Sequence, residues 1–183
     1  MGWRLDECNG DIVPYDLPSG GRVYKALIEV TIGLTSAQAD ERGATGAQIP
    51  SLWPWPHQAL IDTGSQDTHV KKAIVEHLGL EPVTDVEVLA RRQDNRVTAG
   101  LPYHLHMSFG DGQGRDVTVV AGATEDIPHD VIIGSDLLIY CILSWNGPEG
   151  KFTISMPLQP PRFRRFGVVE GMPSCWCCAR RWR

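Results

Sequence analysis

Short runs of apolar and β-branched residues, separated by turn residues, recur through the chain from residue 21 to residue 156. The run GRVYKALIEVTIGL at its start predicts a strand from about Val23 to Leu34, because β-branched and aromatic side chains partly alternate with polar ones. Similar runs recur from Glu81 to Ile133, where QDN marks a hairpin tip, and KFTIS predicts a last strand. The pattern favours a mainly β domain.

One or two short helices are predicted among these strands. The apolar residues of DTHVKKAIVEHLGL, from Val70 to Leu78, follow the i, i+3, i+4 spacing of an amphipathic helix. Asp67 or Thr68 is suited to cap its start, and Gly79 is suited to end it. Further along, SDLLIYCILSW predicts a second short helix or a turn.

A looser stretch lies between the first predicted strand and residue 57. It is rich in glycine, proline and small polar residues, which predicts a long loop or hairpin. It ends in two Trp-Pro pairs, at Trp53 and Trp55. Local packing of the loop is the favoured interpretation of the two indoles, and a lip on a substrate groove is the alternative.

Charge divides the chain into unequal parts. Residues 157–183 contain six Arg and one Glu, a charge of +5, so the chain's net charge of −5 leaves −10 on the remaining residues. We therefore expect an N-terminal extension (1–20), a folded domain (21–156) and a basic, cysteine-containing tail (157–183). An acidic body argues against general nucleic-acid binding.

Composition also suggests where the protein works. Five cysteines, an odd number with irregular spacing, fit a reducing compartment better than a disulfide framework. No stretch approaches the roughly 20 apolar residues that span a membrane, and acids and prolines stand where a signal peptide has its apolar region. We expect a cytoplasmic protein with no membrane partner.

The segment ALIDTGS places Asp62 directly after an apolar run and before Thr63 and Gly64. A carboxylate at the end of a buried strand is costly unless it is hydrogen-bonded, neutralised or used. The plain interpretation is an Asx turn in which Gly64 adopts a positive φ. The context favours a functional one: about 70 residues on, DVIIGSDLL provides a second apolar run that ends in glycine.

These two segments, the helix that closes in HLGL and the run VTAG after the hairpin resemble the retropepsin-like aspartic proteases over residues 20–156. The resemblance implies a small closed β-barrel that is active as a two-fold dimer, in which Asp62 is catalytic, Thr63 grips the partner's turn and Gly64 allows close approach. It implies a flap from about Arg91 to Thr98 and a pocket packed behind the turn. The residues that it assigns to substrate binding are Ser65, Arg91, Arg92, Gln93, Asp94, Asn95, Ile132, Ile133 and Gly134.

The chemistry of such a site requires two carboxyl groups. Carboxyls a few ångströms apart share one proton, so one member activates water while the other hydrogen-bonds to the scissile carbonyl. Only one Asp-Thr-Gly is present, so the second carboxyl must come from another copy of the chain. The predicted function is a homodimeric aspartic endopeptidase acting on polypeptides. The alternative is a non-catalytic dimerisation or peptide-binding module.

The chain departs from the retroviral members at four places. Gly134-Ser135-Asp136 stands where those have Gly-Arg-Asn, the expected flap is polar, and residues 37–56 form an insertion. Ser65 replaces alanine, and its hydroxyl is suited to bond the Asp62 carboxylate and lower the pKa there.

Metal and cofactor sites are not expected. His104 and His106 share one face of a predicted strand, but an alternating pair of histidines is more often a solvated face. The tail cysteines, Cys175, Cys177 and Cys178, lack the paired spacing of zinc ligands even when Cys8 is counted with them.

Overall fold

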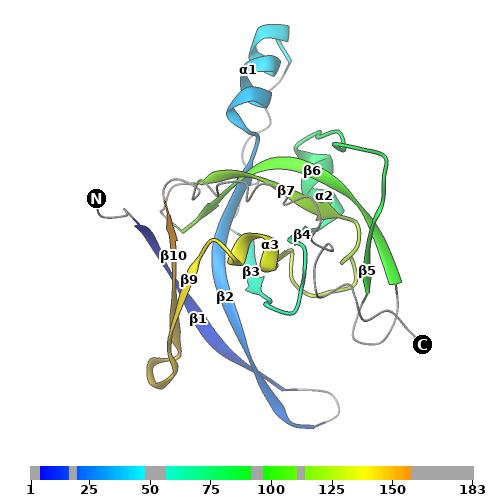
Figure 1. Ribbon diagram of the computed structural model, residues 1–183. Helices are drawn as coiled ribbons and strands as arrows, with labels where there is room; N and C mark the ends of the chain where they lie inside the picture. Colours follow the sequence, from blue (N-terminus) through cyan, green and yellow to red (C-terminus); the bar gives the residue numbers. More distant parts are fainter. Residues whose placement is uncertain (1–4, 17–19, 48–56, 92–96, 111–113, 158–183) are drawn as a thin grey trace, which may run out of the picture.

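The computed structural model describes residues 5–16, 20–47, 57–91, 97–110 and 114–157. Strands dominate these residues, which confirms the mainly β prediction (Figure 1). The strands are β1 (Leu5–Asp16), β2 (Arg22–Gly33), β3 (His57–Ile61), β4 (His69–Val70), β5 (Val88–Arg91), β6 (Val97–Phe109), β7 (Arg115–Ala121), β8 (Val131–Ile133), β9 (Ile142–Asn146) and β10 (Lys151–Pro157). The helices are α1 (Ser36–Thr45), α2 (Lys72–His77), α3 (Ser135–Leu138) and the 3-10 turn η1 (Gly147–Glu149).

The strands form one sheet that returns on itself. Their order is β5-β6-β7-β4-β8-β3-β2-β1-β10-β9, and an additional pairing joins β6 to β2. The long strand β2 makes this possible, because Ala26–Val30 pairs with β3 while Val30–Gly33 pairs with β6. The strands β2, β3, β8, β4, β7 and β6 therefore form a ring of pairings around the core.

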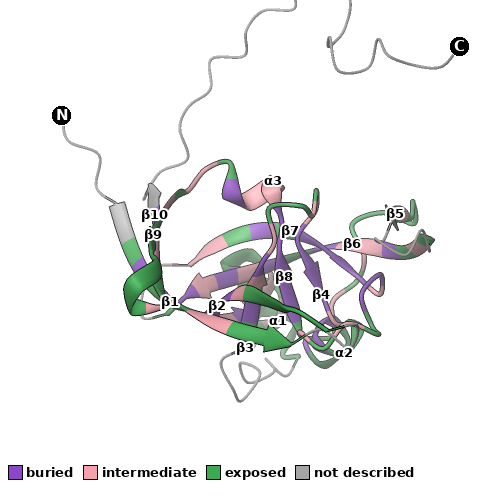
Figure 2. Cartoon of the chain, turned by 90° about the horizontal axis from the view of Figure 1, so that it is seen from below, coloured by how far each residue is buried: buried purple, intermediate pink, exposed green. Residues whose placement is uncertain are grey.

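Side-chain alternation on β2 and β6 builds that core. Ala26, Ile28, Val30 and Ile32 are buried at every second position of β2, whereas Glu29 between them is exposed. Because successive strand residues point to opposite faces, this period fixes the inner face of the strand. Strands β4 and β8, in contrast, are buried at every position, and Figure 2 shows them inside the molecule.

Strand β1 belongs to the same sheet. It pairs antiparallel with β2 from Asp11 to Asp16 and with β10 from Leu5 to Asp11. At Gly10 the ring of Phe152, its partner on β10, occupies the space of a side chain, since a Cβ atom there would lie 2.2 Å from that ring. The first expected boundary, at residue 20, falls in the connection between β1 and β2.

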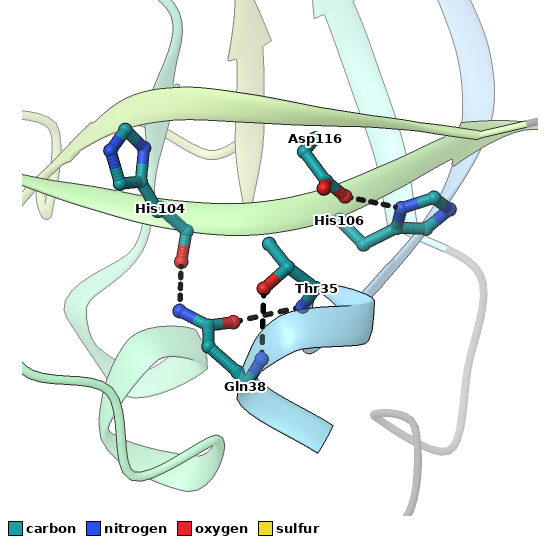
Figure 3. A network of polar contacts seen from close by, with 5 residues as sticks. All are labelled: Thr35, Gln38, His104, His106 and Asp116. Carbon is teal, nitrogen blue, oxygen red and sulfur yellow. Dashed lines mark hydrogen bonds and ion pairs between the residues drawn. The ribbon is translucent and has the colours of Figure 1, made fainter. Parts of the chain in front are cut away.

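The prediction of a loop or hairpin after residue 34 was wrong for residues 36–45, which form α1. This brings the α-helices among the described residues to three. A capping box starts this helix: Gln38 N donates to Thr35 Oγ1, and Thr35 N donates to Gln38 Oε1 (Figure 3). The helix buries none of its residues and stands away from the sheet (Figure 1). Trp53 and Trp55 lie outside the described residues.

Two side chains hold α1 against the rest of the chain. Gln38 Nε2 donates to the carbonyl oxygen of His104 on β6, at 3.0 Å (Figure 3). Arg42 Nη2 donates to the carbonyl oxygens of Leu78 and Gly79, at 2.8 and 2.6 Å, beyond the end of α2. Helix α1 is thus attached by polar contacts at its start and near its end.

Helix α2 begins later than predicted, and neither Asp67 nor Thr68 caps it. His69 and Val70 instead form β4, which pairs with both β7 and β8, and Lys71 stands at the N-cap position. The predicted end is confirmed, since Gly79 has a φ of 57°. A strand pairing with distant parts of the chain has replaced the first turn of the predicted helix.

The remaining elements follow the sequence pattern. Strands β5 and β6 pair as the predicted hairpin, with Arg91 opposite Val97, and its tip lies outside the described residues. The VII run is a fully buried strand, α3 is the short helix after it, and β10 is the last strand. Within the described ranges, no helix has the length and apolarity to cross a membrane.

Candidate functional site

Strand β3 carries Asp62 to the edge of the core. The strand pairs antiparallel with β2 and parallel with β8, so Ile61 lies beside Ile133. The ladder reaches the aspartate itself, because Asp62 N donates to the carbonyl oxygen of Ile133 at 3.0 Å. The backbone of Asp62 is therefore held by β8, while its side chain remains partly exposed.

The turn after Asp62 is closed by two hydrogen bonds. Gly64 N donates to Asp62 Oδ1 at 2.9 Å, and Ser65 N donates to the Asp62 carbonyl oxygen at 3.1 Å. The first bond makes an Asx turn, as the plain interpretation expected. Gly64 does not adopt the positive φ of that interpretation. Thr63 and Gly64, which follow Asp62 in the turn, are both exposed, whereas Asp62 is only partly exposed.

Six hydrogen bonds join residues 65–68 to residues 134–137, and we call this arrangement the clasp. Ser135 N and Ser135 Oγ both donate to the Ser65 carbonyl oxygen, at 2.8 and 2.6 Å. Asp136 N donates to the Gln66 carbonyl oxygen at 3.1 Å. Gly134 N donates to Thr68 Oγ1 at 3.1 Å. The two sequence segments around DTGS and IIGSD are thus one structural unit.

The Asp136 carboxylate supplies the remaining bonds of the clasp. Thr68 N donates to Oδ2 at 3.0 Å, and the Thr68 hydroxyl donates to Oδ1 at 2.7 Å. In addition to the six bonds of the clasp, Leu137 N donates to Oδ1 within the second segment, at 2.8 Å. Where retroviral enzymes have Gly-Arg-Asn, this chain has an aspartate that ties its own loop. Thr68, expected at a helix cap, is fully buried and serves this bond.

Close backbone contact explains the glycine of the second segment. A Cβ atom on Gly134 would lie 2.3 Å from the Asp67 carbonyl oxygen and 2.5 Å from its carbonyl carbon. No side chain fits there unless the two backbones separate. Gly134 is therefore part of the clasp through its lack of a side chain as well as through its N–H.

The prediction that the Ser65 hydroxyl bonds to the Asp62 carboxylate was wrong. The Ser65 hydroxyl donates to the Asp67 carbonyl oxygen at 2.8 Å, inside the loop. A hydroxyl has one hydrogen to donate, so the bond to the loop replaces a bond to Asp62. Ser65 stabilises the shape of the turn.

The other predicted site residues fall into two groups. Ile132, Ile133 and Gly134 are buried directly behind the turn. Arg91 ends β5, and Arg92, Gln93, Asp94 and Asn95 lie outside the described residues. The base of the hairpin is held to the body, because Thr98 Oγ1 donates to the Ala123 carbonyl oxygen at 2.7 Å.

Sequence reasoning missed His69. It lies on β4, opposite Ile132 of β8 and Val120 of β7, and only 4% of its surface is exposed. Its Nδ1 is buried without a hydrogen-bond partner among the described residues. Burial lowers the pKa of His69, and this outweighs the opposing effect of the Asp67, Asp136 and Asp62 carboxylates. Both residues of β4 are buried, and a strand of two residues is too short to leave a recognisable pattern in the sequence.

The histidines on β6 have partners on β7. His106 Nδ1 lies 2.8 Å from Asp116 Oδ1 (Figure 3), and His104 Nδ1 lies 2.8 Å from Thr118 Oγ1. No group of three histidine, cysteine or acidic side chains suited to a metal ion occurs in the described part of the chain.

Comparison with known proteins gives matches among solved structures alone. No protein-family model matches the chain, and no curated protein matches it by sequence. A retropepsin-like aspartic protease from Rickettsia conorii is similar at a TM-score of 0.45 and 13% identity, over 85% of this chain and 96% of that chain. The retroviral protease-like domain of Ddi1 from Leishmania major is similar at a TM-score of 0.37 and 14% identity, over 75% of this chain and 97% of that chain.

Proposed function

We propose that this chain is an aspartic endopeptidase whose active site forms when two copies bring their Asp62 side chains together. The observation that carries the proposal is the Asp62 turn itself. A partly exposed carboxylate stands at the end of a core strand, with its backbone bonded to β8 and the loop behind it held by the clasp. This much support is what a preorganised catalytic group needs.

Two such carboxylates would share one proton, because both cannot ionise at close range. The ionised member accepts a proton from water while the water oxygen bonds to the scissile carbonyl carbon. The protonated member donates a hydrogen bond to the carbonyl oxygen. The carboxyl group that took the proton from water then donates it to the amide nitrogen, and the C–N bond breaks to give a new carboxyl group and a free amine. Both apparent pKa values would belong to the pair.

The second carboxylate is best supplied by another copy of the chain. Asp136 is the other carboxylate that is bonded into this loop, and its two oxygens already accept three hydrogen bonds. A two-fold axis would place two identical Asp62 turns against each other, with Thr63 and Gly64 exposed at the contact. No metal or organic cofactor is needed for this chemistry.

Strand β9 is the surface that we assign to this contact. It ends the sheet order and pairs with β10 alone among the described strands, so one of its edges is open. Ile139, Ile142 and Trp145 are each more than half exposed on this strand and just before it. An open edge that pairs antiparallel with its own copy generates a two-fold axis. The segment continues directly from α3, whose first residue, Ser135, belongs to the clasp.

Cleavage of a denatured protein tests the enzyme against the alternative of a non-catalytic module. We expect the purified chain to cut the substrate at mildly acidic pH, because a shared-proton pair works between its two apparent pKa values. A transition-state-mimicking inhibitor of aspartic proteases should stop the cleavage. Binding of the substrate without any product on a gel would instead support the peptide-binding module.

Substitution of Ile142 with lysine tests the dimer. Its side chain is 60% exposed, so the change should leave the monomer folded while placing a charge on the open edge. We expect a smaller mass in solution and at least about tenfold less cleavage at low protein concentration, a cost of about 1.4 kcal/mol in association. Trp145 is less suitable for this test because it packs on Phe152, with ring centres 5.3 Å apart.

The matched control is Tyr24→Lys. Tyr24 is also an exposed, large side chain, but it lies on β2, near the tip of the β1–β2 hairpin. This variant should keep the mass and the activity of the unaltered chain. If Ile142→Lys has the same mass in solution and the same activity as the control, β9 is not part of the dimer interface.

A further inference from the structure

We propose that His69 is a positioning residue for Asp62: its imidazole must stay neutral for the turn and the clasp to keep their shape. The site then has an acid limit set by protonation of one buried histidine. The proposal rests on the proposed function only where it concerns cleavage. Its consequences for the turn hold for the folded chain whatever that chain does.

The placement of His69 makes a charge there costly. The ring is 4% exposed, on a two-residue strand enclosed by β7 and β8, with Ile132 and Val120 opposite it. Its Nδ1 is sealed from solvent and has no partner in the described part of the chain. A neutral ring can carry its hydrogen on Nε2 and leave Nδ1 bare. Protonation adds an N–H at Nδ1, which would be a buried cationic donor without an acceptor.

Three carboxylates of the site favour a positive charge on the ring, although none of them bonds to it. Asp62 and Asp67 come from the connection between β3 and β4, and Asp136 comes from α3. The nearby Lys71 directs its ammonium elsewhere, to the carbonyl oxygens of Glu125 and Ile127. Val120 and Ile132, opposite the ring on the flanking strands, carry no charge.

Two of these carboxylates already accept hydrogen bonds in the site. Asp62 Oδ1 accepts the Gly64 N–H that closes the turn, and Asp136 accepts the Thr68 bonds of the clasp. To bond its new N–H, a protonated His69 would have to draw in a carboxylate oxygen or open β4 to water. Drawing in Asp62 would break its bond to Gly64, and opening β4 would disturb Thr68, the neighbour of His69 that bonds to Asp136 in the clasp behind Asp62. Acidification would therefore act on the position of the carboxylate that the reaction uses.

The direction of the pH dependence follows from linkage. Burial lowers the pKa of His69 in the folded chain below its ordinary 6.5. Between the folded and the unfolded pKa of His69, the unfolded chain binds more protons than the folded chain. The contribution of His69 to the free energy of unfolding is therefore fully present above about pH 6.5 and is lost as the pH falls below it. Removing the titrating group should abolish this part of the acid sensitivity.

The experiment follows three readouts in the unaltered full chain, in His69→Gln and in the control His104→Gln. His104 is exposed on β6 and lies outside the turn and the clasp. The first readout is the melting temperature between about pH 7.5 and about pH 5, on either side of ordinary histidine titration. We expect the unaltered chain and the control to lose more degrees than His69→Gln. Equal losses in all three would overturn the proposal.

The second readout is nuclear magnetic resonance. The His69 ring signal, assigned as the one missing from His69→Gln, should titrate below 6.5. The amide signals of Thr63 and Gly64 should change with the same midpoint in the unaltered chain and lose that transition in His69→Gln. A ring titration with a midpoint at or above pH 6.5 would overturn the proposal. So would amide signals of Thr63 and Gly64 that do not change at the midpoint of the ring titration. If His69→Gln does not fold, the titration of the unaltered chain, with the ring assigned through its backbone connections, decides alone.

The third readout is the pH–rate profile of cleavage. The acid limb should move to lower pH in His69→Gln and stay in place in His104→Gln. An unmoved limb would overturn the acid limit. If the chain cleaves nothing at any pH, the proposed function fails, and the first two readouts still determine whether His69 positions the turn.

Discussion

Replacing Asp62 with asparagine is expected to lower cleavage by at least about 10³-fold while the fold is retained. Asparagine cannot ionise, so neither member of the pair could take a proton from water. The turn should survive, because the Asn side-chain oxygen can accept the Gly64 N–H that Asp62 Oδ1 accepts at 2.9 Å. Cleavage of a labelled peptide and the melting temperature measure the two effects separately.

Asp67→Asn is the matched control. It makes the same chemical change five residues further along the same loop, and the loop uses the Asp67 carbonyl group, which the change preserves. We expect the control to keep its activity within a few fold. Loss of activity in both variants would point to a catalytic pair within one chain. Full activity of Asp62→Asn would exclude the aspartic mechanism.

The parts of the fold that depend on neighbours in sequence were predictable. The β2 pattern and the buried VII run gave the inner face of the sheet, and Gly79 marked the end of α2. Helix α1 was missed although its signal is local. Thr35 and Gln38 form a capping box, but the alanines, glycines and charges that follow have no apolar face to reveal a helix.

The parts that depend on distant pairings were not predictable. His69 and Val70 continue the helical spacing of the residues after them, yet pairing with β7 and β8 makes them a strand. The pairing of β2 with β6, which closes the ring of strands, likewise has no signal in the local sequence. Strand β2 changes its partner from β3 to β6 at Val30 without a turn.

The candidate site shows the same division. Asp62, Ile132, Ile133 and Gly134 could be selected from their motifs. The roles of Thr68 and Asp136 could not, because each depends on a partner from the other segment of the clasp. A hydrogen bond across about 70 residues of sequence becomes visible only when both segments are in place.

Substitution of Gly134 with alanine is expected to have the second-largest effect, through steric conflict in the clasp. Gly134 has a φ of −92°, which alanine adopts without strain, so backbone freedom is not at issue. The added Cβ would lie 2.3 Å from the Asp67 carbonyl oxygen, and neither group is the end of a flexible side chain. We expect a loss of about 3 kcal/mol in the free energy of unfolding, or roughly 6–12 °C in melting temperature.

Gly147→Ala is the control for this prediction, since no atom lies within 4 Å of a Cβ built there and its φ is not left-handed. It should melt within about 2 °C of the unaltered chain. Cleavage by Gly134→Ala should fall even at temperatures where the variant is folded, because separating residues 134 and 67 shifts the loop that holds Asp62. If Gly134→Ala is as stable as the control, the two backbones are not in contact. If it is unstable but fully active while folded, the clasp supports the fold without positioning the carboxylate.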